Sequence, residues 1–173
     1  MVKRALVPSG GCDVVMTPRP LAAAIIAHFN PRGIMLDPCR GEGAFYDQFP
    51  PHPYMHQKQH WCELSEGRDF LAIDKSDGWH YDWIVSNPPW SRFRAFNKRA
   101  MAISDNVVWL CTVNHFWLKA RLRDMDEAGF GIKEIALVDT PPLPWPQSGF
   151  QLAAVYIKRD HSGPVTISRL AST

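Results

Sequence analysis

The sequence predicts an α/β fold in which helices cover both faces of a mostly parallel sheet with an antiparallel last strand. Short apolar runs that end in acidic or polar residues alternate with helical segments, a pattern typical of such sheets. Two apolar runs near the carboxyl end, residues 132–138 and 150–158, flank a proline-rich loop, which suits a hairpin. With 173 residues, we expect residues 1–173 to form one domain.

The first helix is expected over residues 21–29. Thr17 is a good N-cap, and proline, here Pro18, is favourable at the first helical position. Asn30-Pro31-Arg32-Gly33 ends the helix. Residues 34–37, Ile-Met-Leu-Asp, then form a short buried strand that ends in an acid.

A glycine loop, Pro38-Cys39-Arg40-Gly41-Glu42-Gly43, follows this strand, and a helix starts within residues 44–49. Strand, glycine loop and helix make half of a βαβ unit, and glycine lets the backbone approach a ligand closely. Dinucleotide binding is the usual competing interpretation, but Tyr46 occupies the place of the third glycine of that fingerprint.

The second strand is expected over residues 60–64, with Glu63 near its end. An acid at a strand end about 20 residues past a glycine loop is where a ribose hydroxyl pair would be held; the alternative is a solvated carboxylate. Asp69 and Phe70 offer an acceptor and an apolar wall for a purine ring, or, alternatively, a helix N-cap and a core residue.

The third strand runs through residues 83–85 and stops at Asn87-Pro88-Pro89-Trp90, because proline cannot donate to a ladder. Asn87 therefore lies just beyond a strand end, where open α/β sheets bind ligands. A side-chain amide, a stiff loop and a flat aromatic ring suit a planar base that carries an exocyclic amine. The alternative is a proline turn with a buried Trp.

The remaining elements are a helix over residues 91–103 with Ser91 as N-cap, a strand over 106–113, a helix over 116–128 and a possible short strand over 165–168. We expect a core stripe on the first of these helices, formed by Phe93, Phe96, Ala100 and Ile103. Basic residues on both helices are candidates for phosphate contact or, alternatively, are solvated: Arg92, Arg94, Lys98, Arg99, Lys119, Arg121 and Arg123.

Net charge, cysteine spacing and the length of apolar runs argue against several classes of protein. A net charge of +2 permits a polyanionic partner without requiring one. The cysteines, Cys12, Cys39, Cys62 and Cys111, form no C-x-x-C pair, which argues against a zinc knuckle or a disulfide framework. No apolar run approaches the roughly 18 residues of a membrane span and no signal peptide is evident, so we expect a soluble, cytoplasmic protein.

Three histidines, His52, His56 and His60, recur every four residues, which on a helix would form a metal-binding face. Prolines at positions 50, 51 and 53 argue against a helix there, so we expect a surface loop and no metal site.

The ordered motifs resemble those of S-adenosylmethionine-dependent N6-adenine DNA methyltransferases. Residues Asp37 to Phe45 resemble that family's D-P-x-x-G-x-G-x-F cofactor loop, and residues Asn87 to Trp90 resemble its [DNS]-P-P-[YFW] catalytic motif. Residues Asp13 to Leu21 resemble the motif that precedes the cofactor loop. The resemblance implies a Rossmann-like class I methyltransferase fold with a seven-stranded sheet. It suggests a small orphan enzyme, of viral or mobile-element origin, in which 173 residues leave little room for a target-recognition region.

The resemblance also implies roles for single residues. Asn87, Pro88, Pro89 and Trp90 would be catalytic, with the amide oxygen of Asn87 and the Pro88 carbonyl accepting hydrogen bonds from the target amine. The methionine part of S-adenosylmethionine would lie against Thr17, Pro18, Asp37, Cys39, Gly41 and Gly43. Glu63 would bind the ribose, and Asp69 with Phe70 the adenine. Arg92 and Arg94 would contact DNA, and Trp145 would wall the opposite side of the target pocket, unless it is merely packed.

Other interpretations stay open. Motifs of the N-P-P-aromatic type also serve amines of RNA and glutamine side chains of proteins. A non-catalytic methyltransferase-fold subunit of a complex, or a nucleotide-sugar or dinucleotide enzyme, would explain fewer of the motifs. DNA is the expected partner, with a homodimer or a partner subunit possible and no membrane association.

Overall fold

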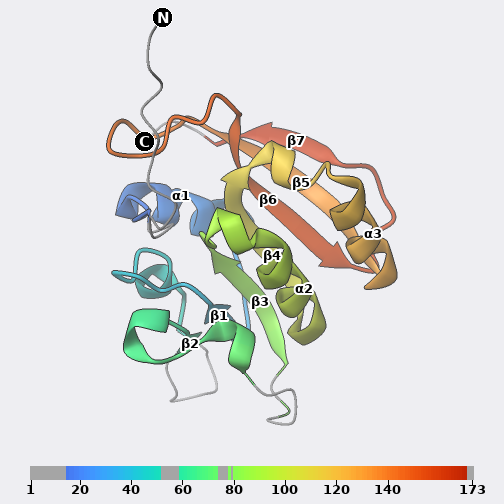
Figure 1. Ribbon diagram of the computed structural model, residues 1–173, viewed down its shortest axis with the longest axis horizontal. Helices are drawn as coiled ribbons and strands as arrows, with labels where there is room; N and C mark the ends of the chain where they lie inside the picture. The colour runs from blue at the N-terminus through green and yellow to red at the C-terminus, as the bar shows by residue number, and fades with distance from the viewer. Residues whose placement is uncertain (1–14, 52–58, 74–77, 79, 171–173) are drawn as a thin grey trace, which may run out of the picture.

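A computed structural model describes residues 15–51, 59–73, 78 and 80–170. Seven strands form one sheet in the order β2-β1-β3-β4-β6-β5-β7 (Figure 1). In chain order these strands are β1 Met35–Asp37, β2 His60–Trp61, β3 Tyr81–Ser86, β4 Ser104–Thr112, β5 Phe130–Val138, β6 Leu152–Arg159 and β7 Thr166–Arg169. The α/β fold with a seven-stranded, mostly parallel sheet is thereby confirmed.

The antiparallel strand is β6, which pairs with β4 on one side and β5 on the other. The hairpin expected across the proline-rich loop reverses the chain at this point. β6 is not the last strand, however, because the chain turns back once more and β7 runs parallel to β5 at the edge of the sheet. All other neighbouring pairs are parallel.

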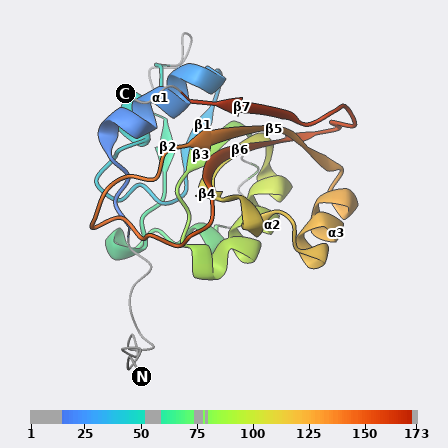
Figure 2. The ribbon, with the colours of Figure 1, turned by 90° about the horizontal axis from the view of Figure 1, so that it is seen from above.

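Helices cover both faces of the sheet (Figure 2). Helix α1, Arg19–Phe29, packs on one face, and helices α2, Phe93–Ile103, and α3, Lys119–Glu127, pack on the other. Two apolar cores result, one on each side of the buried central strand β4. The predicted core stripe of α2, Phe93, Phe96, Ala100 and Ile103, is buried throughout. No helix in the described part of the chain is both long and apolar enough to cross a membrane.

Two predicted N-caps were wrong. Helix α1 is capped by Pro18 rather than Thr17, and the cap makes no side-chain hydrogen bond. Proline also occupies one of the first helical positions, which removes one of the amides that a cap would serve. A 3-10 turn, Trp90–Arg92, precedes α2, so that Arg92 rather than Ser91 becomes its N-cap.

Three elements are shorter than the sequence predicts. The segment 44–49 forms only the 3-10 turn Tyr46–Gln48, because Phe49 precedes a proline and adopts extended backbone. Strand β2 ends at Trp61, since the side chain of Glu63 caps a second 3-10 turn, Leu64–Glu66. Helix α3 starts three residues late and leaves Trp117 and Leu118 in the preceding turn.

Candidate functional site

Parallel strands β1 and β3 end side by side, and Asp37 is the last residue of β1. Its carboxylate is fully buried. Oδ1 accepts hydrogen bonds from Ser86 Oγ at 2.7 Å and from the Cys39 amide at 3.1 Å. Oδ2 has no hydrogen-bond partner among the described residues. Burial raises the pKa of Asp37 to about 7, because desolvation of the carboxylate outweighs the interactions with the Ser86 hydroxyl and with the backbone amides of Cys39 and, more weakly, Tyr46.

The glycine loop of residues 38–43 folds tightly over this carboxylate. The Arg40 amide donates to the Cys62 carbonyl and the Gly43 amide to the Arg40 carbonyl. Gly43 requires glycine, since its φ is +84° and a Cβ there would lie 2.9 Å from the Asp47 carboxylate. The Gly41 amide donates to Glu63 Oε2 at 2.9 Å, which ties the loop to the end of β2.

Glu63 is held as a carboxylate. Partial burial raises its pKa, but hydrogen bonds from the Ser65 side chain and from the amides of Gly41 and Ser65 outweigh burial, so that the pKa lies below its ordinary value. Ser65 donates to Oε1 through both its amide and its hydroxyl. A carboxylate offers about four lone-pair directions, so Oε2, with one recorded donor, retains acceptor capacity.

Asn87 lies directly after β3, as predicted, in a pocket at the same end of the sheet. Its Nδ2 donates to the Val15 carbonyl at 3.0 Å, an arrangement that leaves Oδ1 as the acceptor of the amide. The pocket brings together three groups that were predicted separately, namely Thr17, the loop residues Cys39 and Gly41, and Asn87. The contact with Val15 was not predicted from the sequence.

Among the described residues, Cys39 is the only one with a thiol that lines this pocket. Burial raises its pKa far above the ordinary range, with the nearby carboxylates of Asp37 and Glu63 acting in the same direction. The thiol is therefore protonated at neutral pH and is a poor nucleophile. Among the described residues, Cys39, Cys62 and Cys111 are all free, while Cys12 lies outside them.

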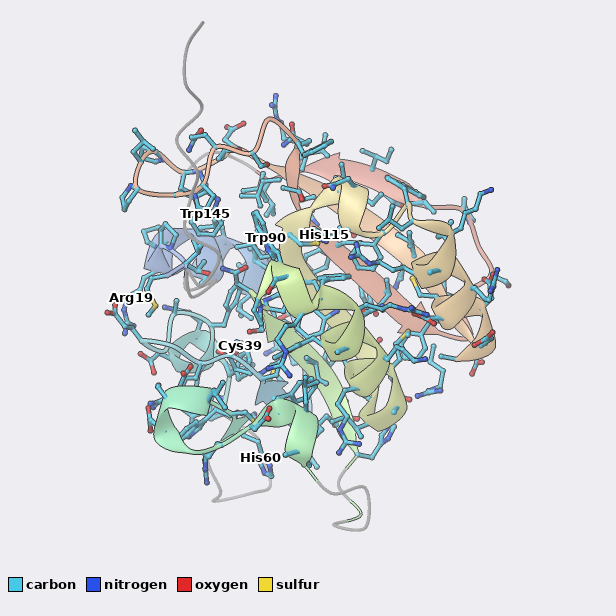
Figure 3. All side chains as sticks on the ribbon, viewed as in Figure 1. Arg19, Cys39, His60, Trp90, His115 and Trp145 are labelled. Atoms are coloured by element: carbon cyan, nitrogen blue, oxygen red, sulfur yellow. The ribbon has the colours of Figure 1, made fainter. Side chains whose placement is uncertain are left out.

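Trp90 is fixed by three contacts. Its indole Nε1 donates to the Leu110 carbonyl at 3.3 Å, and its ring lies 6.5 Å from Trp145 and 5.8 Å from His115. Figure 3 shows Trp145, Trp90 and His115 in a row, with Cys39 below them. His115 was not predicted, although its position three residues past the end of β4 could have suggested it.

The structure favours a packed Trp145 over a wall of the target pocket. Its side chain is only 3% exposed, and its ring meets that of Trp90 at 67°. Two rings at this angle cannot both stack on one planar base. Trp145 therefore supports Trp90 from the side.

Asp69 and Phe70 are not among the residues that line the pocket of Asn87. Asp69 Oδ1 accepts from the Leu71 amide and caps the turn Phe70–Ala72, while Phe70 is 1% exposed and packs on Phe96. The N-cap and core alternatives therefore account for what both residues do here. Asp69 also lines a second pocket beside β2, together with Trp61 and Arg68. Contact of Asp69 or Phe70 with adenine stays a prediction.

Most of the predicted phosphate-binding cations have partners within the chain. Arg94 donates to both oxygens of Asp124, at 2.6 and 2.9 Å, and this hydrogen-bonded pair holds the pKa of Asp124 below its usual range. Lys98 lies 3.6 Å from the same carboxylate. Arg121 donates to His115, and Arg99 to the Ile73 carbonyl. Arg92, Lys119 and Arg123 are exposed, and the described residues offer them no recorded ion pair.

Of the three histidines that recur every four residues, the structure describes only His60. His60 contacts the Tyr81 hydroxyl at 3.2 Å, and His52 and His56 lie outside the described residues, as does Asp13 of the first motif. Within the described ranges, no group of three or more His, Cys, Asp or Glu side chains is arranged to hold a metal ion.

No family model and no curated protein matches the sequence. Solved structures do match. The modification subunit of a putative type I restriction enzyme from Vibrio vulnificus is 15% identical with a TM-score of 0.60, over 95% of this chain and 49% of that one. A putative class I S-adenosylmethionine-dependent methyltransferase from Listeria monocytogenes is 11% identical, with a TM-score of 0.55, over 89% and 63%.

A putative RNA methyltransferase from Pyrococcus horikoshii is 17% identical with a TM-score of 0.55, over 83% of this chain and 86% of that one. The chain spans about half the length of the restriction-enzyme subunits that it matches. At these identities the likeness concerns the fold alone. The chain has the Rossmann-like fold of class I S-adenosylmethionine-dependent methyltransferases.

Proposed function

We propose that this chain transfers a methyl group from S-adenosylmethionine to an exocyclic amine, with N6 of adenine in DNA as the target. One observation carries the proposal. Asn87, with its amide oriented by the Val15 carbonyl, shares a pocket with the glycine loop at the ends of two adjacent parallel strands. This proximity supports a role for Asn87 in binding the target amine beside a loop that would bind the cofactor.

The residues at this end of the sheet fit the cofactor. Asp37 Oδ2 is a buried acceptor that lacks a donor among the described residues, and the cofactor carries an ammonium group that could provide one. Glu63 is ionised and retains acceptor capacity for ribose hydroxyls. Gly41, at a φ of +50°, leaves the pocket open where a Cβ would approach Met16 Sδ to 3.1 Å. When bound, S-adenosylmethionine supplies a methyl group activated by a positively charged sulfur.

The chain's own residues would orient the target amine. The lone pair of an exocyclic amine is conjugated with its ring, which makes the nitrogen a poor nucleophile. Acceptors outside the ring plane, Asn87 Oδ1 and the Pro88 carbonyl, would draw the N–H groups out of that plane and localise the lone pair on nitrogen. Orientation of this kind is the main catalytic device, and no cysteine nucleophile is required.

Trp90 would stack on the target base, a contact worth about 1–3 kcal/mol for a base on an aromatic side chain. Its contacts with Leu110, His115 and Trp145 hold the ring in place before the base arrives. In a duplex the target must first leave the stack, which costs least for a base that is already unpaired.

DNA is favoured by the order of the motifs and by the structural likeness to type I modification subunits. An RNA amine is the second candidate, favoured by the likeness to a putative RNA methyltransferase and to a 23S rRNA methyltransferase, the latter with a TM-score of 0.58. A protein glutamine or a non-catalytic subunit has no observation in its favour beyond the motif itself.

The test is incubation with methyl-labelled S-adenosylmethionine and separate panels of duplex DNA, single-stranded DNA, RNA and protein. We expect label on adenine in DNA, identified by nucleoside chromatography. Label on RNA or protein alone would replace the substrate, and the absence of transfer to every panel, together with no cofactor binding, would refute the proposal.

A further inference from the structure

The turn between β4 and α3 carries two large apolar side chains that the fold does not bury. Trp117 is 52% exposed and Leu118 is 54% exposed. Helix α3 begins only at Lys119, so both residues precede the helix instead of forming part of it. Single exposed apolar residues are common, but an adjacent pair with a Trp beside a candidate site suggests a binding surface.

Cations that could meet a polyanion gather on the same segment. Lys119 and Arg123 are exposed and lie four residues apart on α3, which places them on one side of the helix. Arg121, between them in sequence, is turned inward to His115, and Arg94 is held by Asp124. The segment therefore offers an aromatic ring followed by two exposed cations, ahead of the acidic residues Asp126 and Glu127 at the end of α3.

The segment adjoins the proposed target site. His115, two residues before Trp117, lies 5.8 Å from Trp90, ring centre to ring centre. Two residues of chain span at most about 7 Å, so Trp117 lies within reach of nucleotides that neighbour one stacked on Trp90.

We propose that residues Trp117, Lys119 and Arg123 bind the nucleic-acid strand that flanks the target nucleotide, and that this strand is unpaired. The proposal rests on the proposed function and specifies its substrate. In a duplex, the faces of the bases are covered by their neighbours, whereas an unpaired strand offers a base face to each aromatic side chain. Aromatic rings interleaved with cations are the usual means by which proteins bind single strands. The phosphates complement Lys119 and Arg123, and this charge complementarity favours a strand over an apolar protein partner.

The test measures fluorescence anisotropy of a short labelled single strand of DNA and of its duplex, over a series of salt concentrations. Trp117→Ala should weaken single-strand binding at least about fivefold, which corresponds to about 1 kcal/mol of base stacking, and should leave duplex binding nearly unchanged. Lys119→Gln with Arg123→Gln should flatten the log–log salt dependence by about 0.7 for each cation removed.

Two matched controls separate this surface from general effects. Arg32→Gln removes an exposed cation next to the amino end of β1, and Ile167→Ala removes an apolar side chain that is 68% exposed on the edge strand β7. Neither should change single-strand affinity or its salt dependence. Circular dichroism should show that all of these variants are folded, because every substituted side chain is exposed.

The results separate the two proposals. Wild-type affinity of Trp117→Ala for the single strand, or a loss of self-association on sedimentation in place of a loss of strand binding, would overturn this surface even if the enzyme methylates DNA. If Trp117→Ala weakens strand binding but no nucleic acid is ever methylated, the surface stands and the proposed function fails.

Discussion

Replacing Asp37 by Asn measures how much the buried carboxylate at the candidate site destabilises the fold. Asn has the same shape, and its Oδ1 can keep the hydrogen bonds from Ser86 Oγ and the Cys39 amide. The substitution removes only the charge and replaces Oδ2, which has no partner among the described residues, by an amide nitrogen. The unpaired NH2 group should destabilise the variant at every pH. The informative quantity is therefore how the difference in stability between the variant and the wild type changes with pH.

The pKa of Asp37 is raised to about 7 by burial, whereas an unfolded Asp titrates near pH 4. The native state therefore binds this proton more tightly than the unfolded state does. The contribution of Asp37 to wild-type stability should therefore be highest below about pH 4, fall between about pH 4 and pH 7, and then level off. Roughly three pKa units at 1.36 kcal/mol each correspond to about 4 kcal/mol. Asp37→Asn lacks this loss.

The assay is thermal unfolding of wild type and Asp37→Asn at constant ionic strength across this pH range. The melting temperature of the variant should gain on that of the wild type by roughly 10 °C between about pH 4 and pH 7, at about 2–4 °C per kcal/mol. Glu42→Gln, which removes an exposed carboxylate from the same loop, should show no such gain. Parallel profiles for Asp37→Asn and wild type would refute the reasoning. Saturating S-adenosylmethionine should shrink the gain, because a nearby ammonium favours the carboxylate.

Three further outcomes are expected. S-adenosylmethionine at about 100 times its dissociation constant should stabilise the chain by about 2.7 kcal/mol in a thermal melt; a shift with NAD or ATP instead would contradict the cofactor assignment. Asn87→Ala should lower turnover by about 10²–10³-fold, by analogy with loss of one oxyanion-hole group, and should destabilise the fold only by loss of the hydrogen bond to Val15. Asn87→Asp keeps an acceptor oxygen and should retain more activity. Equal activity of both variants would count against amine orientation. Arg94→Gln should lower the melting temperature without changing the salt dependence of duplex binding, whereas Arg92→Gln should flatten it by about 0.9; the reverse pattern would show that Arg94 contacts phosphate.

The strand ends of the site could be predicted from sequence because the stop signals are local. Proline at positions 88 and 89 ends β3 at Asn87 wherever the rest of the chain lies, and φ values of +50° and +84° at Gly41 and Gly43 confirm a tight loop after β1. Parallel pairing of β1 with β3 then brings the loop and Asn87 together. These features depend on backbone chemistry that each residue carries with it.

The partners of side chains could not be predicted in the same way. Arg92 and Arg94 look equivalent in sequence, yet α3 places Asp124 beside one of them and not the other. Trp117 and Trp145 both follow strands that end at the site, but one is half exposed and the other is 3% exposed. In each case the outcome depends on a neighbouring element that is distant in the chain, and periodicity contains no information about it.

A comparison of two carboxylates near β1 and β3 distinguishes a structural role from a functional one. At the amino end, Asp82 Oδ2 accepts from the Ile34 amide at 2.7 Å in an exposed position, where solvent can satisfy its remaining capacity. At the carboxyl end, Asp37 is fully buried, with one oxygen that lacks a recorded donor. An apolar residue at position 37 would avoid this desolvation, but it would leave the Ser86 hydroxyl and the Cys39 amide without an acceptor, so one oxygen of the acid has a structural role. A donor supplied by a ligand would satisfy the second oxygen, Oδ2. The carboxylate lies beside the glycine loop, and its other oxygen is bonded to Ser86 at the end of β3. This position supports our proposal that a ligand binds at this end of the sheet.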